Sequence, residues 1–133
     1  MLKVFVYGTL KPGEWNYPRY CQGKIIDSQP AYTLACLYSL PFGYPAMTPG
    51  NQRVEGFLLT FANQAYLASL DELEGCTARQ PRDSLSYYRQ MVSIYNQEGD
   101  YLTEAWAYFM TQKQVKLFGG TFEPSGCWRF LKE

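Results

Sequence analysis

Histidine is missing from this sequence altogether, although the chain has 133 residues. Its absence excludes catalytic triads and dyads that use imidazole, zinc sites with histidine ligands, and metalloprotease helices. The four cysteines (Cys21, Cys36, Cys76 and Cys127) stand far apart and form no C-x-x-C pair, so they make a poor zinc site. We expect reduced thiols that pack as small apolar side chains in a cytoplasmic protein. An enzyme built from this chain must therefore work with carboxylates, thiols, phenols or its own backbone.

Net charge and long apolar runs are missing as well. Twelve basic side chains balance twelve acidic ones, so no long-range field favours nucleic acid or an anionic membrane surface. No stretch approaches 18 consecutive apolar residues, and the N-terminal MLKVFVYG lacks the pattern of a signal peptide. These features predict a small-molecule partner and argue against nucleic acid and membrane; they leave the oligomeric state open.

Core material, in contrast, is plentiful. Apolar residues make up 47% of the chain, which contains 12 Tyr, 8 Phe and 3 Trp. A chain of this length buries roughly two-thirds of the surface that it exposes when unfolded. We therefore expect a single domain over residues 1–133 with one core.

Apolar runs rich in β-branched and aromatic residues predict the strands, at residues 2–7, 31–40, 53–61, 88–96 and 101–110. The last two flank a polar connection that contains glycine, and together they predict a β-hairpin. Residues 41–52 (PFGYPAMTPGNQ) predict an irregular loop, because their prolines and glycines disfavour regular structure. The tail from residue 111 is expected to wrap the body as loop with a short helix or strand.

The main helix is predicted over residues 63–74 (NQAYLASLDELE). Asn63 is placed to cap its start and Gly75 to end it. Leu67 and Leu70 lie on one face at helical spacing, and this face is expected to point inward.

Glu74 carries the most informative charge of that helix. At about 100° per residue it lies about 20° from Leu67 and about 40° from Leu70, so it is expected to face inward, whereas Glu72 faces outward. We expect the negative end of the helix dipole and partial desolvation both to raise the pKa of Glu74, as a general acid/base at neutral pH requires. Helix ends also fray, in which case Glu74 would be a solvated helix end. Periodicity alone leaves both alternatives open.

The stretch VFVYGTLKPGEWNYP places a glycine-rich turn directly after the first strand. Such a turn can point successive N–H groups at one spot and bind a carboxylate, a phosphate or an oxyanion. The sequence argues against a phosphate-binding P-loop, because Glu14 and Trp15 stand where Lys and Ser/Thr are needed and Pro12 has no N–H. The alternative is a tight turn that needs Gly8 for a positive φ.

Six segments follow one another in the order seen in the gamma-glutamylcyclotransferase-like family. They are YGTLKPGEWN (7–16), GYPAM (43–47), VEGFLLTF (54–61), LDELEG (70–75), YYRQMVSIY (87–95) and EAWAYFM (104–110). The resemblance covers roughly residues 3–110. The first segment is most similar to the gamma-glutamylamine cyclotransferase branch, in which Y-G-T-L-K-x-G-x-x-N is typical.

This resemblance implies an α+β fold, a small mixed or antiparallel β-barrel with one main helix and a ligand cavity at the mouth of the barrel, without a metal or organic cofactor. It implies that Glu74 is the catalytic acid/base. It also implies a set of substrate-binding residues, some through backbone N–H groups and some through side chains near the cavity: Tyr7, Gly8, Thr9, Leu10 and Tyr88.

The implied reaction is the attack of a γ-glutamyl compound's own α-amine on its own γ-carbonyl, which releases 5-oxoproline and an amine or amino acid. Because the attack is intramolecular, no enzyme nucleophile is needed. Two alternatives remain: a non-catalytic small-molecule binding member of the same fold, and a hydrolase that pairs Glu55 with Glu74 within about 10 Å. The sequence departs from the amine branch at Tyr17, where histidine is common, and leaves the leaving group open.

Overall fold

The computed structural model describes residues 2–8, 10, 11, 14, 17–41, 43–73 and 87–128, with the backbone alone for residues 19, 20, 72 and 73. Within this part the elements follow one another as β1 (Leu2–Val6), α1 (Tyr17–Tyr20), β2 (Ile25–Ser39), β3 (Pro45–Phe61), α2 (Tyr66–Leu73), β4 (Tyr88–Tyr95), β5 (Tyr101–Phe109), α3 (Gln112–Leu117) and β6 (Thr121–Phe122). None of the helices described is long and apolar enough to cross a bilayer.

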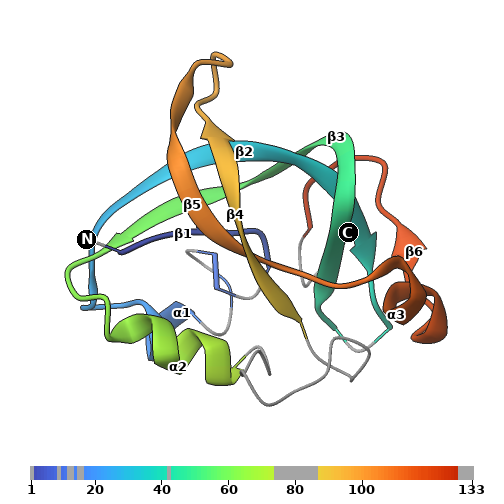
Figure 1. Cartoon of the computed structure of the whole chain (residues 1–133), viewed down its shortest axis with the longest axis horizontal. Coiled ribbons are helices and arrows are strands. Elements are labelled where there is room, and N and C mark those ends of the chain that lie inside the picture. Colours follow the sequence, from blue (N-terminus) through green and yellow to red (C-terminus); the bar gives the residue numbers. More distant parts are fainter. Residues whose placement is uncertain are drawn as a thin grey trace.

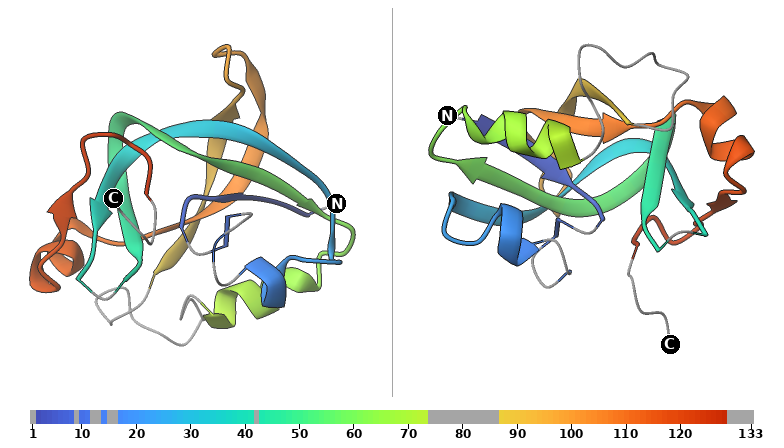
Figure 2. Two further views of the ribbon diagram at one scale, coloured as in Figure 1. Left: turned by 180° about the vertical axis from the view of Figure 1, so that it is seen from behind. Right: turned by 90° about the horizontal axis from the view of Figure 1, so that it is seen from below.

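The six strands form one sheet that closes into a ring. Their order is β3-β1-β5-β4-β2-β6, and β2 also pairs with β3, which closes a ring of β3, β1, β5, β4 and β2 (Figure 1). The short β6 pairs with the end of β2. β1 pairs antiparallel with β3 and parallel with β5, so the sheet is mixed. The helices lie outside the ring, as Figure 2 shows from two further directions. The small mixed barrel with one main helix, α2, is thus confirmed.

β2 and β3 are longer than the sequence predicts, and the expected loop over residues 41–52 is wrong for most of its length. β3 begins at Pro45, which pairs with Ser39. A strand accepts proline at its first residue, where the missing N–H costs no ladder bond. The misleading signal is Pro49 and Gly50. The register moves from Ala35 opposite Gln52 to Cys36 opposite Thr48, so residues 49–51 bulge out of the ladder.

The helix and the hairpin lie where the sequence predicts them. The side chain of Asn63 accepts a hydrogen bond from the N–H of Ala65 at 2.8 Å, and regular helix begins at Tyr66. β4 and β5 pair antiparallel, and Gly99 at φ 90° forms part of the turn that joins them. The tail forms the short α3 and β6, also as expected.

Apolar side chains fill both the interior of the ring and the space between the ring and α2. Alternate residues of β1 serve the two sides, because strand side chains alternate: Phe5 belongs to the interior cluster, and Val4 to the cluster under the helix. Leu70 of α2 is 1% exposed and packs in the second cluster, where Leu67 joins it. The predicted inward face of the helix is confirmed for these two residues.

Candidate functional site

The turn after β1 is closed by a hydrogen bond from the N–H of Lys11 to the carbonyl of Gly8 at 3.0 Å. This bond uses the N–H of Lys11 and not those of Gly8 or Leu10, two of the three predicted backbone donors. The third, Thr9, lies outside the described residues.

Gly8 is required here for lack of space. A Cβ at this position would lie 2.8 Å from two ring carbons of Pro45, at the start of β3. Gly8 does not have a positive φ, so the alternative based on a left-handed turn is wrong. The close approach to Pro45 replaces it as the physical reason for glycine.

Lys11 is a buried cation that the sequence analysis did not single out. Only 6% of the residue is exposed, and its ammonium donates a hydrogen bond to the carbonyl of Trp128, near the end of the described chain. Trp128 is 2% exposed and packs in the interior of the ring. The C-terminal segment therefore holds the turn after β1 from inside the molecule. A lysine beside prolines and glycines gives no sequence signal for such burial, because it depends on a residue 117 positions away.

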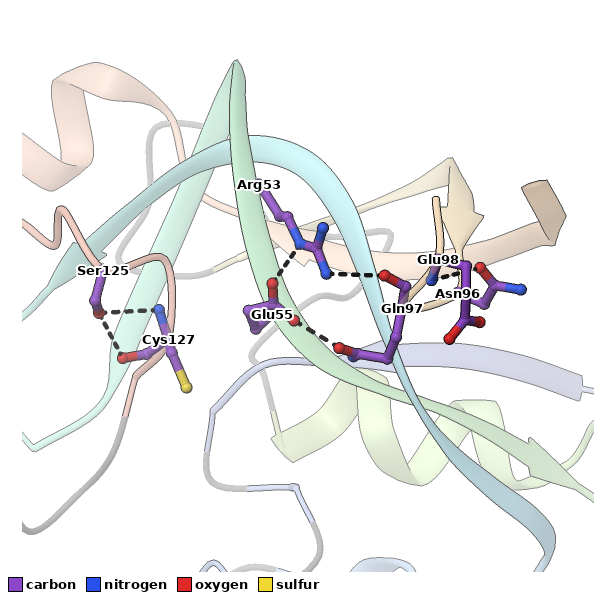
Figure 3. Close-up of polar contacts among 7 residues, drawn as sticks. All are labelled: Arg53, Glu55, Asn96, Gln97, Glu98, Ser125 and Cys127. Atoms are coloured by element: carbon purple, nitrogen blue, oxygen red, sulfur yellow. Dashed lines mark hydrogen bonds and ion pairs between the residues drawn. The ribbon is translucent and has the colours of Figure 1, made fainter. Parts of the chain in front are cut away.

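A short turn leads into Trp128. The hydroxyl of Ser125 accepts a hydrogen bond from the N–H of Cys127 at 3.2 Å and donates one to its carbonyl at 3.1 Å (Figure 3). Within this turn, the carbonyl of Gly126 accepts a hydrogen bond from the N–H of Glu55 in β3 at 2.7 Å. The tail is thus fastened to β3 before it enters the ring.

Cys21 supports the same turn from the outside. Its thiol lies 3.8 Å from the carbonyl of Leu10, to which it donates a weak hydrogen bond, and both residues are buried. Burial raises the pKa of the Cys21 thiol to about 12, although the charge of Lys24 opposes the shift. Such a thiol is protonated at neutral pH and inert, as expected for a cysteine that packs as a small apolar side chain.

Tyr7 directly follows β1 and packs inside the ring, with 6% of the residue exposed. Its ring stacks on Phe5 at 6.3 Å between centroids, and its hydroxyl donates a hydrogen bond to the carbonyl of Tyr108 in β5 at 2.6 Å. Its position next to Gly8 is thus fixed by packing and by a buried hydrogen bond.

Tyr88 lies at the same end of the ring. It is half-buried, and its ring stacks on Phe109, its partner in the sheet, at 5.8 Å. The preceding residue, Tyr87, donates its hydroxyl to the carbonyl of Pro45. Pro45 also packs against Gly8, so it contacts both the turn after β1 and the residue that precedes β4. Four of the predicted site residues lie on these two neighbouring segments: Tyr7, Gly8, Leu10 and Tyr88. We call this end of the ring, where Gly8, Pro45 and Tyr87 meet, the Gly8 end.

Glu74, the predicted acid/base, lies outside the described residues, directly after the last residue of α2. The part of α2 that precedes it is held firmly. The carboxylate of Asp71 accepts two hydrogen bonds on the same oxygen, from Nε of Arg89 at 2.9 Å and from the hydroxyl of Tyr108 at 2.6 Å. The guanidinium of Arg89 also stacks over Trp106, at 4.3 Å from the ring centroid.

Glu55, the second carboxylate of the hydrolase alternative, is engaged elsewhere. Its side chain is 30% exposed and pairs with Nε of Arg53 at 2.5 Å, and it accepts a longer bond from the amide of Gln97 at 3.5 Å (Figure 3). No observation favours a catalytic role for this side chain. Within the described chain, no three carboxylate or cysteine side chains gather in a way that could hold a metal ion.

Comparison with known structures agrees with the architecture. The protein YkqA from Bacillus subtilis superposes with a TM-score of 0.64 at 25% identity; the match covers 96% of this chain and 39% of that one. The protein ytfP from Escherichia coli gives a TM-score of 0.60 at 28% identity and covers 96% of both chains. An AIG2-like protein from mouse gives 0.61 at 22% identity, covering 83% of this chain and 77% of that one, and shows the shared fold alone.

Comparison of sequences leads to a family. A protein of Vibrio cholerae, provisionally named a gamma-glutamylcyclotransferase, is 34% identical over 85 residues, which are 62% of this chain and 70% of that protein. Residues 4–130 match the family described as gamma-glutamyl cyclotransferase, AIG2-like. Because this match spans nearly the whole chain, the chain belongs to the gamma-glutamyl cyclotransferase, AIG2-like family.

Proposed function

We propose that this protein is a gamma-glutamyl cyclotransferase that converts a γ-glutamyl compound into 5-oxoproline and a free amine or amino acid. The observation that carries the proposal is the family match over residues 4–130, which includes both Glu74 and the turn after β1. The absence of histidine supports it too, because this reaction needs no protein nucleophile and no imidazole.

In the proposed reaction the nitrogen of the substrate's α-amine attacks its γ-carbonyl carbon. A new C–N bond closes the five-membered lactam, and the amide C–N bond to the leaving group breaks. The α-ammonium group loses two protons and the departing amine gains two, so protons are moved and none is consumed. Glu74 is proposed to accept a proton from the ammonium and to return it to the departing nitrogen, which is general acid/base catalysis by one carboxylate.

The turn after β1 is proposed to bind the substrate's carboxylate or the oxyanion that develops on the γ-carbonyl. The donors would be the backbone N–H groups of Gly8, Thr9 and Leu10, since fixed N–H dipoles stabilise such charge strongly in a site that excludes water. The contacts of the described residues of the turn support this role. Pro45 packs against Gly8, and Lys11 is fastened to the tail. Tyr7 and Tyr88 are proposed to border the substrate.

For the leaving group we propose an amine, as in the gamma-glutamylamine branch, on the basis of Y-G-T-L-K-x-G-x-x-N at residues 7–16. Because Tyr17 replaces the common histidine, the test compares an ε-lysyl leaving group with an amino acid and with the dipeptide of glutathione.

The test incubates the protein with γ-glutamyl-alanine, γ-glutamyl-ε-lysine and glutathione, and measures 5-oxoproline by mass spectrometry. Glu74→Gln keeps the shape of the side chain and removes proton exchange, so we expect about a hundredfold to ten-thousandfold loss of kcat. Equal product from the wild type and the variant would exclude Glu74 as the proton carrier. Binding of a substrate without release of 5-oxoproline would favour the alternative of a non-catalytic binding protein.

A further inference from the structure

Tyr108 connects the two parts of the chain that the proposed function needs. Its backbone carbonyl accepts the hydroxyl of Tyr7 at 2.6 Å, and its own hydroxyl donates to Asp71 of α2 at 2.6 Å. Tyr7 directly precedes Gly8, and Asp71 lies three residues before Glu74 in the sequence. One residue of β5, itself 2% exposed, is therefore bonded to both.

Asp71 is more firmly held than an ordinary helix carboxylate. Its side chain is 18% exposed and that of Arg89 is 25% exposed, so the pair is largely screened from water by protein. Arg89 is itself fixed between Asp71 and the face of Trp106. A charge-assisted bond with a second donor on the same oxygen is stronger and more directional than a surface ion pair.

Glu74 follows Asp71 by only three residues in the sequence. Three residues span at most about 11 Å even when fully extended, which is close to the Debye length of about 10 Å at 0.1 M salt. We therefore expect the charges of Asp71 and Arg89 to act on Glu74 at low ionic strength.

We propose that Asp71, held by Arg89 and Tyr108, is a positioning residue that fixes the end of α2 relative to β1 and sets the electrostatic potential at Glu74. The inference rests on the proposed function. Arg89 offsets the negative charge of Asp71, so that the carboxylate can anchor the helix without making proton release from Glu74 harder. Lys24 also faces α2: its ammonium nitrogen lies 5.8 Å from the ring centroid of Tyr66, which is in the first turn of the helix.

The sharpest test compares the pH profiles of kcat for two single variants at low salt. Asp71→Asn removes a negative charge and leaves Arg89, so it lowers the pKa of Glu74 and moves the acid limb of the profile to lower pH. Arg89→Gln leaves Asp71 uncompensated, so it moves the limb to higher pH. We expect shifts of about half a pH unit in opposite directions. The double variant should return near the wild-type position.

Misplacement of the helix end should act on kcat more than on KM. Both single variants and Tyr108→Phe, which keeps the carbonyl that Tyr7 uses, should lower kcat by about tenfold to a hundredfold. A purely structural role would lower the content of folded enzyme and leave the pH profile in place. The matched control is Arg53→Gln, which breaks the exposed ion pair to Glu55 and should change neither kcat nor the profile.

Hydrogen exchange provides a readout that does not depend on activity. Asp71→Asn and Tyr108→Phe should each raise the exchange of α2 amides by about tenfold, and Glu74→Gln should not. If the pH profiles of Asp71→Asn and Arg89→Gln shift in the same direction, or do not shift, the electrostatic role is overturned. If the hydrogen exchange of the α2 amides is unchanged in Asp71→Asn and Tyr108→Phe, the positioning role is overturned. If the wild type releases no 5-oxoproline, the proposed function fails, and the exchange experiment alone still decides whether Asp71 positions the helix.

Discussion

The two ends of the β4–β5 hairpin are built in different ways. At the Gly8 end, which is the open end of the hairpin, residues far apart in the sequence hold the strands. Asp71 bonds to Arg89 and Tyr108, and the N–H of Met110 bonds to the carbonyl of Met47. At the tip, which projects beyond the ring in Figure 1, the shorter bonds are local, and Gln97 reaches Arg53 and Glu55 of β3 through exposed bonds of 3.5 Å. The side chain of Asn96 accepts a hydrogen bond from the N–H of Glu98 at 3.0 Å (Figure 3) and another from the N–H of Asp100 at 2.9 Å.

The two ion pairs of the described chain repeat this contrast. Asp71 and Arg89 are 18 residues apart, on different elements, and largely buried. Arg53 and Glu55 are neighbours on one face of β3, with side chains 45% and 30% exposed. The Asp71–Arg89 pair thus anchors a helix, whereas the Arg53–Glu55 pair lies on the surface of one strand and contributes little to stability. The free energy of an ion pair depends on its burial and on which elements it connects.

The largest expected difference between the two regions concerns glycine. A Cβ on Gly56 would lie 2.2 Å from the carbonyl oxygen of Val6, a backbone atom that cannot move aside, so Gly56→Ala should destabilise the fold by about 3 kcal/mol or more. Gly99→Ala, at the tip with φ 90° and a nearest neighbour at 3.5 Å, should cost about 1–2 kcal/mol. Urea unfolding of both variants measures the two values. Equal losses would show that β1 can move away from β3.

A smaller difference is expected between two cations. Lys11→Met keeps the apolar stem but leaves the buried carbonyl of Trp128 without this donor, which should cost about 1–3 kcal/mol. Arg53→Met removes a half-exposed guanidinium from Glu55 and from the face of Tyr32, and should cost less than about 1 kcal/mol. Thermal unfolding at one pH compares the two. A larger loss at Arg53 would contradict the assigned roles.

The smallest effect sharpens the comparison through pH. The pKa of Cys21 is about 12 in the folded protein and 9.0 as the ordinary value, so the folded state holds the proton more tightly. The resulting stability is fully present below pH 9 and is lost as the pH rises from 9 towards 12. The stability gap between wild type and Cys21→Ala should therefore narrow by about 1 kcal/mol per pH unit above pH 9. Urea unfolding at pH 7, 9 and 10 tests it; a constant gap would mean that the thiol is accessible to water.

Local patterns in the sequence were sufficient to predict β1, the hairpin and α2. Each depends on signals within the element itself, such as Asn63 before the helix. Local patterns failed at residues 45–52, where Pro45 and Gly50 indicated a loop. The long ladder with β2 overrides those preferences and lets the extra residues bulge.

The candidate site was predictable only in part. The turn after β1 is a local glycine signal, whereas the reason for Gly8, the ring of Pro45, comes from another strand. The burial of Lys11 and the bonds of Asp71 depend on closure of the ring, which joins elements that no short window of sequence contains. Glu74 and Thr9 lie outside the described residues and stay predictions.

The central place of β1 in the ring also sets an order of events for the growing polypeptide. β1 is synthesised first, yet its antiparallel partners are Phe57–Phe61 and its parallel partner is Trp106. Until those residues have left the ribosome, its apolar side chains have no sheet to join, and contacts so distant in sequence form slowly. Among the described strands, the earliest in the sequence is therefore among the last to be completed, and its apolar side chains are open to aggregation during that interval.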